Sequence, residues 1–71
     1  MLLINAKSGN EYVIEKVVNL VAKQKLTRLG FNLGERLILK SCSKIGVIVE
    51  IDGVTFGLSE QLAKKIMVKQ V

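Results

Sequence analysis

The sequence predicts an all-β fold in a single domain. An Asp52-Gly53 pair separates two runs rich in β-branched and aliphatic residues, Val47–Ile51 and Val54–Leu58. An Asp-Gly pair supplies the two positive φ angles of a type I′ turn, so these runs predict a β-hairpin. The chain has only 71 residues, of which 49% are hydrophobic, and it has no proline or low-complexity segment that could serve as a linker. We therefore expect one domain over residues 1–71, with short strands and a modest core.

The first long strand is expected to follow a turn at Ser8–Asn10. The segment Glu11–Val18 is rich in residues that favour strands, and Tyr12 and Ile14 alternate onto one face, which we expect to point inward. The alternation fails near Val17, and this irregularity predicts a bulge or a bend at the end of the strand.

A change of period then predicts a short helix over about 21–29. Ala22, Leu26 and Leu29 are spaced at i, i+4 and i+7, which places them on one helix face. Gly30 follows directly, at the position where helices commonly end in a left-handed residue. A helix of two turns is not stable alone in water, so we expect it to dock on the sheet through Leu26 and Leu29.

Besides the first strand and the two arms of the hairpin, the rest of the chain predicts two more strands. It also predicts one helical turn. Arg36–Lys40 reads as a strand, and Ser59 is a suitable N-cap for a helical turn over Glu60–Lys65. The tail Ile66–Val71 can pair with the first strand and close a barrel. Five short strands, with a helix after the first and a helical turn before the last, are typical of a small SH3-like barrel. The main expected core residues are Leu26, Leu29, Leu37, Leu39, Val49, Ile51, Phe56, Leu58 and Ile66.

The residues that usually carry catalysis or bind metals are scarce. The chain has no histidine and one cysteine, Cys42, which has no evident activating base and no partner for a disulfide. The six acidic residues are spread along the sequence without forming a spaced pair. Gly30 and Gly34 precede strand-like residues, so we interpret them as turn glycines and not as a phosphate-binding loop. We expect no enzymatic activity, no cofactor and no metal site in the monomer.

The net charge of +5 admits nucleic acid, an anionic lipid surface or an acidic protein surface as a partner. The lysines and arginines are scattered, with no run longer than two, so charge alone does not choose among these partners. The N-terminal apolar run of four residues is too short for a secretory signal, and no segment approaches the roughly 18 apolar residues of a membrane span. Together with the single cysteine, this pattern predicts a cytoplasmic protein.

The residues at the end of the helix form the most function-like cluster. Lys25 and Arg28 fall away from the apolar stripe, while Phe31 and Leu33 are apolar residues in a turn, where polar residues are usual. With Asn32, these side chains would form an apolar docking patch ringed by cations, which is typical of a protein interface. The alternative is that Phe31 and Leu33 fold back into the core.

The segment Lys25–Gly34 resembles the signature of the ferrous iron transport protein A (FeoA) family. That signature has a basic helix ending in Leu-x-x-Leu-Gly, an apolar residue, a short spacer and a second glycine that opens a strand. The chain departs from the family at Leu33 and in Ile45–Val47, where the family often has proline. Other positions that fit the family pattern, in chain order, are Leu3, Ala6, Gly9, Gly53, Phe56, Leu58, Ala63 and Ile66–Val68.

The resemblance implies an accessory protein of ferrous iron uptake that binds the cytosolic region of FeoB, the membrane ferrous iron transporter, and modulates it. Any link to iron would then run through that partner. Two other readings stay open: a small nucleic-acid-binding barrel, which would stack bases on exposed aromatic residues, and a freestanding module similar to the C-terminal domain of iron-dependent repressors. Weak self-association also stays open.

Overall fold

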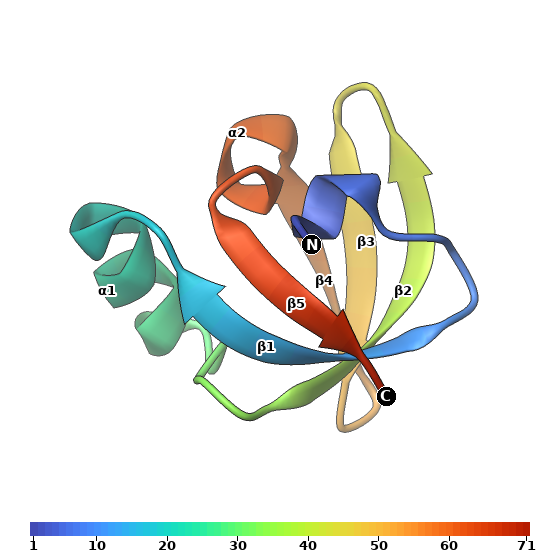
Figure 1. Ribbon diagram of the computed structural model, residues 1–71, viewed down its shortest axis with the longest axis horizontal. Coiled ribbons are helices and arrows are strands. Elements are labelled where there is room, and N and C mark those ends of the chain that lie inside the picture. Colours follow the sequence, from blue (N-terminus) through green and yellow to red (C-terminus); the bar gives the residue numbers. More distant parts are fainter.

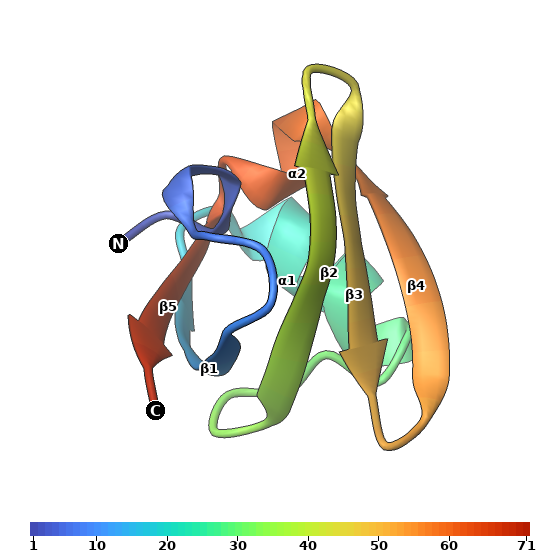
Figure 2. The same cartoon turned by 90° about the vertical axis from the view of Figure 1, so that its right-hand side faces the viewer.

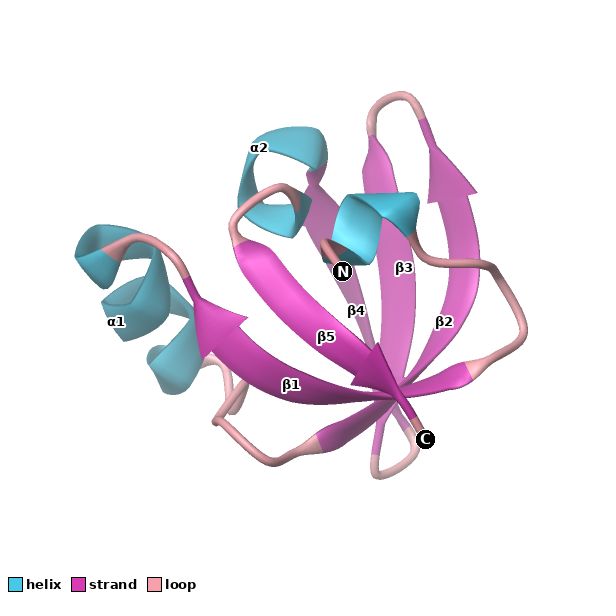
Figure 3. Ribbon diagram, in the orientation of Figure 1, coloured by secondary structure: helices cyan, strands magenta, loops and turns pink.

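The protein is a curled five-stranded antiparallel sheet with two short α-helices and one 3-10 turn (Figures 1 and 3). The computed structural model describes all 71 residues, Met1–Val71. The predicted order of five strands, with a helix after the first and a helical turn before the last, is confirmed. The elements are η1 Leu3–Asn5, β1 Glu11–Val17, α1 Leu20–Arg28, β2 Arg36–Ser43, β3 Gly46–Ile51, β4 Val54–Ser59, α2 Glu60–Ala63 and β5 Ile66–Gln70.

The hairpin between β3 and β4 has the geometry that its sequence predicts. Asp52 and Gly53 have φ angles of 51° and 80°, and Ile51 pairs with Val54 directly across the turn. Both central residues are therefore left-handed, as a type I′ turn requires. The register continues without a shift from Ile51–Val54 to Gly46–Ser59.

The sheet has the strand order β4-β3-β2-β1-β5, and it curls so that β1 and β5 face β3 and β4 across the core (Figure 2). The pairing register shifts between Ile14 and Lys16 in β1 and between Leu39 and Ser41 in β2. Such irregularities bend a strand and increase its twist, which allows a small sheet to wrap around a core. The irregularity expected near Val17 therefore lies slightly earlier in β1, where Glu15 and Lys16 are two exposed residues in a row.

The last strand pairs with β1, as predicted, but β4 and β5 are the two ends of the sheet and do not bond to each other. Helix α2 connects them across the opening. The outer edge of β5 is covered by the N-terminus, because the Met1 ammonium donates to the Val68 carbonyl oxygen at 3.0 Å and the Val68 N–H donates to the Met1 carbonyl oxygen at 2.7 Å.

Neither helix has the length and apolar character needed to cross a bilayer.

A single cluster of buried side chains fills the inside of the curled sheet, and most of the expected core residues belong to it. Phe56 packs against this cluster while remaining partly exposed. Leu29 was expected in the core, but it is 47% exposed, because α1 ends at Arg28 and docks only through Ala22 and Leu26. The cluster also includes Leu3 from η1 and Phe31 from the turn after α1.

Candidate functional site

Helix α1 lies at one side of the barrel and extends beyond the end of β1 (Figure 1). It begins at a cap, because the Asn19 side-chain oxygen accepts a hydrogen bond from the Ala22 N–H at 3.1 Å. Ala22 and Leu26 are the buried residues of this helix, and the remaining side chains are exposed. Because so little of α1 is buried, most of its surface is available to a partner.

The end of α1 explains why Phe31 does not belong to a docking patch. The Phe31 N–H donates to the Leu26 carbonyl oxygen at 2.9 Å and the Gly30 N–H donates to the Thr27 carbonyl oxygen at 3.1 Å, with Gly30 at a φ of 94°. This is a Schellman motif, in which the residue after the left-handed glycine typically packs against the residue at the Leu26 position. Phe31 is accordingly 2% exposed, and its ring meets that of Phe56 edge to face, with centroids 5.0 Å apart. The prediction that Phe31 is a docking residue is contradicted by this burial, and its alternative as a core residue is confirmed.

Leu33 and Asn32 lie in a turn that is fixed at both ends. The Gly34 N–H donates to the Ile14 carbonyl oxygen at 2.8 Å, and the Ile14 N–H donates to the Glu35 carbonyl oxygen at 3.0 Å. These bonds hold the turn to β1, while Leu33 stays 51% exposed and Asn32 is also exposed. The structure therefore presents an aliphatic side chain to solvent on a backbone that is tied to the sheet.

Lys25 and Arg28 are exposed and lie in the last turn of α1, where cations interact favourably with the helix dipole. They share a shallow hollow of about 200 Å³ with Val21 and Gln24. Neither cation forms an ion pair, because the two ion pairs of the protein are Lys40–Glu50 and Lys64–Glu60. Both charges are thus free to meet an acidic partner.

We call these exposed residues at the end of α1 the α1 C-terminal surface. The surface consists of Lys25, Arg28, Leu29, Asn32 and Leu33. Leu29 was missed as a site residue because its spacing matches the buried stripe of the helix. The signal that could have identified it is its position directly before the capping glycine, where the helix is already turning away from the sheet.

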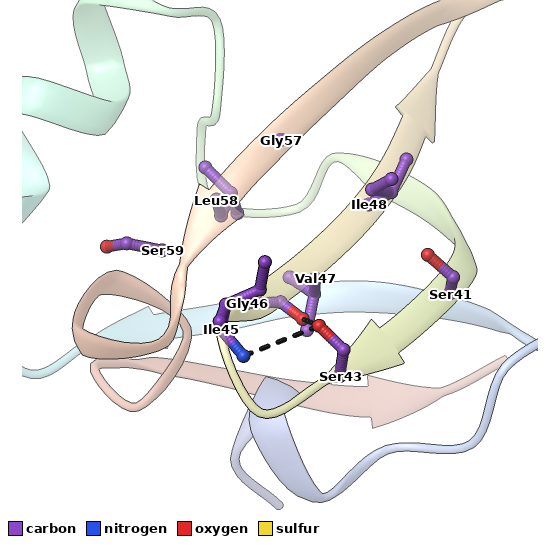
Figure 4. A pocket seen from close by; sticks show the side chains of 9 residues that line it. All are labelled: Ser41, Ser43, Ile45, Gly46, Val47, Ile48, Gly57, Leu58 and Ser59. Carbon is purple, nitrogen blue, oxygen red and sulfur yellow. Dashed lines mark hydrogen bonds between the residues drawn. The ribbon is translucent and has the colours of Figure 1, made fainter.

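A second hollow, of about 320 Å³, lies on the surface beside the β2–β3 turn (Figure 4). Serine side chains and aliphatic groups line it, and none of its residues is ionisable. Ser43 Oγ accepts a hydrogen bond from the Ile45 N–H at 3.4 Å and donates one to the Gly46 carbonyl oxygen at 3.4 Å, so this side chain stabilises the turn. These residues offer neither a base nor an acid for catalysis.

Cys42 is exposed near the end of β2, and its thiol donates to the Ile4 carbonyl oxygen with an S···O distance of 3.6 Å. No three of the Cys, Asp and Glu side chains lie close enough together to hold a metal ion.

Known structures share this fold. A crystal structure of an iron uptake regulatory protein, FeoA, matches with a TM-score of 0.89 at 23% identity, over 100% of this chain and 97% of that one. The solution structure of a FeoA protein from Chlorobium tepidum matches with a TM-score of 0.85 at 22% identity, over 100% of this chain and 70% of that one. The manganese-activated repressor ScaR, in a structure with bound Zn²⁺, matches with a TM-score of 0.91 at 23% identity, over 100% of this chain but only 37% of that one.

No curated protein sequence matches this chain. The model of the FeoA domain family, however, matches residues 1–70, which is nearly the whole sequence. The match therefore includes both the curled sheet and the helix with its capped end, and the chain belongs to the FeoA domain family.

Proposed function

We propose that this protein is a cytoplasmic accessory protein of ferrous iron uptake. It binds the cytosolic region of a FeoB-type membrane transporter through the α1 C-terminal surface and modulates transport. Membership of the FeoA domain family supports the link to iron uptake. The observation that carries the choice of surface is that Lys25 and Arg28 have no acidic partner and lie on the same helix end as the exposed Leu29.

The chemistry of this surface suits a protein partner. An aliphatic centre formed by Leu29 and Leu33 can be desolvated on docking, while the flanking cations select an acidic surface and accelerate association. The Schellman motif and the bonds between the following turn and β1 hold the surface in place before binding, so little conformational entropy is lost.

A binding measurement with the purified cytosolic region of the transporter tests the proposal. Arg28→Glu and Leu33→Ser should each raise the Kd roughly fivefold to thirtyfold, as expected for contacts worth about 1–2 kcal/mol. Lys44→Glu and Ile45→Ser provide matched controls, because both residues are exposed in the β2–β3 turn, away from α1. If the two α1 variants bind as tightly as the wild type, or the controls lose as much affinity, the assignment of this surface is wrong.

Nucleic-acid binding by a small barrel usually relies on exposed aromatic rings. Tyr12 and Phe31 are 1% and 2% exposed, and Phe56 is partly buried, so no fully exposed aromatic ring is present to stack on bases.

The similarity to ScaR favours one second candidate, a freestanding regulatory module that binds a metal-dependent repressor. This candidate predicts binding to a purified repressor in place of the transporter region. Titrating both partners against the same labelled chain distinguishes the two functions.

A further inference from the structure

The first turn of α1 carries a cluster of exposed aliphatic side chains that neither the fold nor the proposed docking surface uses. Leu20 is 69% exposed and Val21 is 72% exposed, and Val18, just before the helix, is 58% exposed. Single exposed aliphatic residues are ordinary, but here three lie within four positions of the chain, at the start of a helix that protrudes from the barrel (Figure 1). We call these three residues the α1 tip.

Cations lie on both sides of the α1 tip, and no carboxylate lies among them. Leu20 lines a hollow of about 450 Å³ together with Lys23 and Arg28. Val21 lines another hollow, of about 180 Å³, together with Lys25 and Lys65. No acidic residue lines either hollow, and none of the four cations takes part in an ion pair.

The distribution of charge along the chain makes this side of the protein distinct. The segment from Lys16 to Gly34 contains four of the eleven cations and none of the six acidic residues. The other seven cations and all six acids lie elsewhere, so the rest of the chain has a net charge of only +1. The net charge of +5 is therefore concentrated in the segment that includes α1, although the cations look scattered in the sequence.

We propose that the α1 tip binds an anionic lipid bilayer, with the aliphatic side chains inserted among the headgroups and the flanking cations against the lipid phosphates. A bilayer surface offers an apolar interior beneath a negatively charged layer, which matches aliphatic residues at a tip with lysine and arginine around them. Long cationic side chains can lie along the helix while their charged ends reach the phosphates. A protruding helix fits a broad and deformable surface of this kind without requiring a complementary groove.

Binding to lipid does not depend on the transporter as a partner. Each cation near an anionic membrane surface strengthens binding about fivefold, and a few aliphatic side chains add to that attraction. The expected association is reversible and salt-sensitive, because Lys23, Lys25 and Arg28 are exposed and Lys65 is only half-buried.

Co-sedimentation with vesicles tests the proposal directly. We expect the full chain to bind vesicles that contain phosphatidylglycerol, to bind pure phosphatidylcholine vesicles far more weakly, and to lose binding as salt is raised. The double variant Leu20→Ser/Val21→Ser should reduce binding to the anionic vesicles at least about tenfold, since it removes two exposed aliphatic groups while leaving the charge unchanged. Lys23→Glu/Lys65→Glu should abolish that binding.

Two control variants separate the α1 tip from general attraction between a basic protein and an anionic surface. Ile45→Ser/Val54→Ser removes two aliphatic residues that are 86% and 54% exposed on other elements. Lys7→Glu/Lys44→Glu makes the same change in net charge as the lysine variant of the tip. Both controls should bind anionic vesicles close to the wild-type level, and all variants should keep the wild-type melting temperature within a few degrees.

The proposal is overturned if the wild type does not bind anionic vesicles, if the serine variant of the tip binds as well as the wild type, or if the controls lose as much binding as the tip variants. It is also overturned if the tip variants lose binding to the transporter region but keep binding to anionic vesicles, since an acidic protein would then be the partner. Leu33→Ser distinguishes this proposal from the proposed function, because it should weaken binding to the transporter region and leave vesicle binding intact.

Discussion

Replacing Phe31 with Ala removes an aromatic side chain that the Schellman motif places in the core. Phe31 is 2% exposed, and a phenylalanine buries roughly 150–250 Å² of surface on folding. At about 25 cal/mol per Å², this area corresponds to about 4–6 kcal/mol, which is an upper bound because alanine keeps the first carbon of the side chain. Measured losses for buried phenylalanine residues are about 3–5 kcal/mol, and we expect Phe31→Ala to fall in this range.

Such a loss approaches the whole free energy of unfolding of a small domain, which can be as low as about 5 kcal/mol. Urea denaturation followed by circular dichroism measures it, provided that the variant still folds. Phe31→Leu keeps the position apolar and loses mainly the edge-to-face contact with Phe56, so its cost should be only about 1–2 kcal/mol. This milder variant gives a complete unfolding curve even if the alanine variant does not.

A double-mutant cycle isolates the contact between the two rings. Phe31→Leu combined with Phe56→Leu should show a coupling free energy of about 0.5–1.5 kcal/mol, because the centroids lie 5.0 Å apart in edge-to-face geometry. Leu33→Ser, two positions along the chain and half-exposed, should cost less than about 0.5 kcal/mol. If Phe31→Ala were as mild as Leu33→Ser, the placement of Phe31 in the core would be refuted.

Three further predictions follow from the local geometry and from the residues available to bind metal. Gly46→Ala should destabilise the fold by about 1–3 kcal/mol in urea denaturation, because its new carbon would overlap the Leu58 carbonyl. Gly57→Ala, on the neighbouring strand and with open space around it, is the matched control and should be neutral or slightly stabilising. Asn19→Ala should lower the free energy of unfolding by about 1 kcal/mol through loss of the α1 N-cap, and an unchanged midpoint would show that this cap is unimportant. Adding ferrous iron should leave the melting temperature of the monomer unchanged in a thermal shift assay, since a ligand bound only to the native state must raise it.

The elements that depend on neighbouring residues could be predicted from the sequence. The Asp52-Gly53 turn follows from the φ angles that these two residues tolerate, and the helix end at Gly30 follows from its left-handed conformation. The burial of Phe31 was also encoded locally, in its position directly after the capping glycine. An apolar residue in an ordinary turn would be expected to be exposed, whereas an apolar residue directly after a capping glycine packs back against the helix.

The surroundings of α1 could not be predicted in this way, because they depend on where the helix docks. Leu29 has the spacing of the buried stripe, but α1 lies at the side of the barrel and meets it through Ala22 and Leu26 alone. The exposure of Leu20 and Val21 has the same origin. The register shifts in β1 and β2 each coincide with two consecutive exposed polar residues, Glu15–Lys16 and Lys40–Ser41, but this pattern alone does not give the exact position of a bulge.

The composition of α1 differs from what helix stability alone would favour at its N-terminus. Stability would favour an acidic residue in the first turn of a helix, where it interacts with the helix dipole. Helix α2 follows this rule, with Glu60 in its first turn paired to Lys64 at 2.7 Å, whereas α1 has no acidic residue in its first turn. Asn19, Ala22 and Leu26 already account for how α1 caps and docks, so a glutamate on its exposed face would be compatible with the fold. The exposed aliphatic residues and unpaired cations of α1 therefore carry no nearby acid that would oppose the proposed binding to an anionic surface.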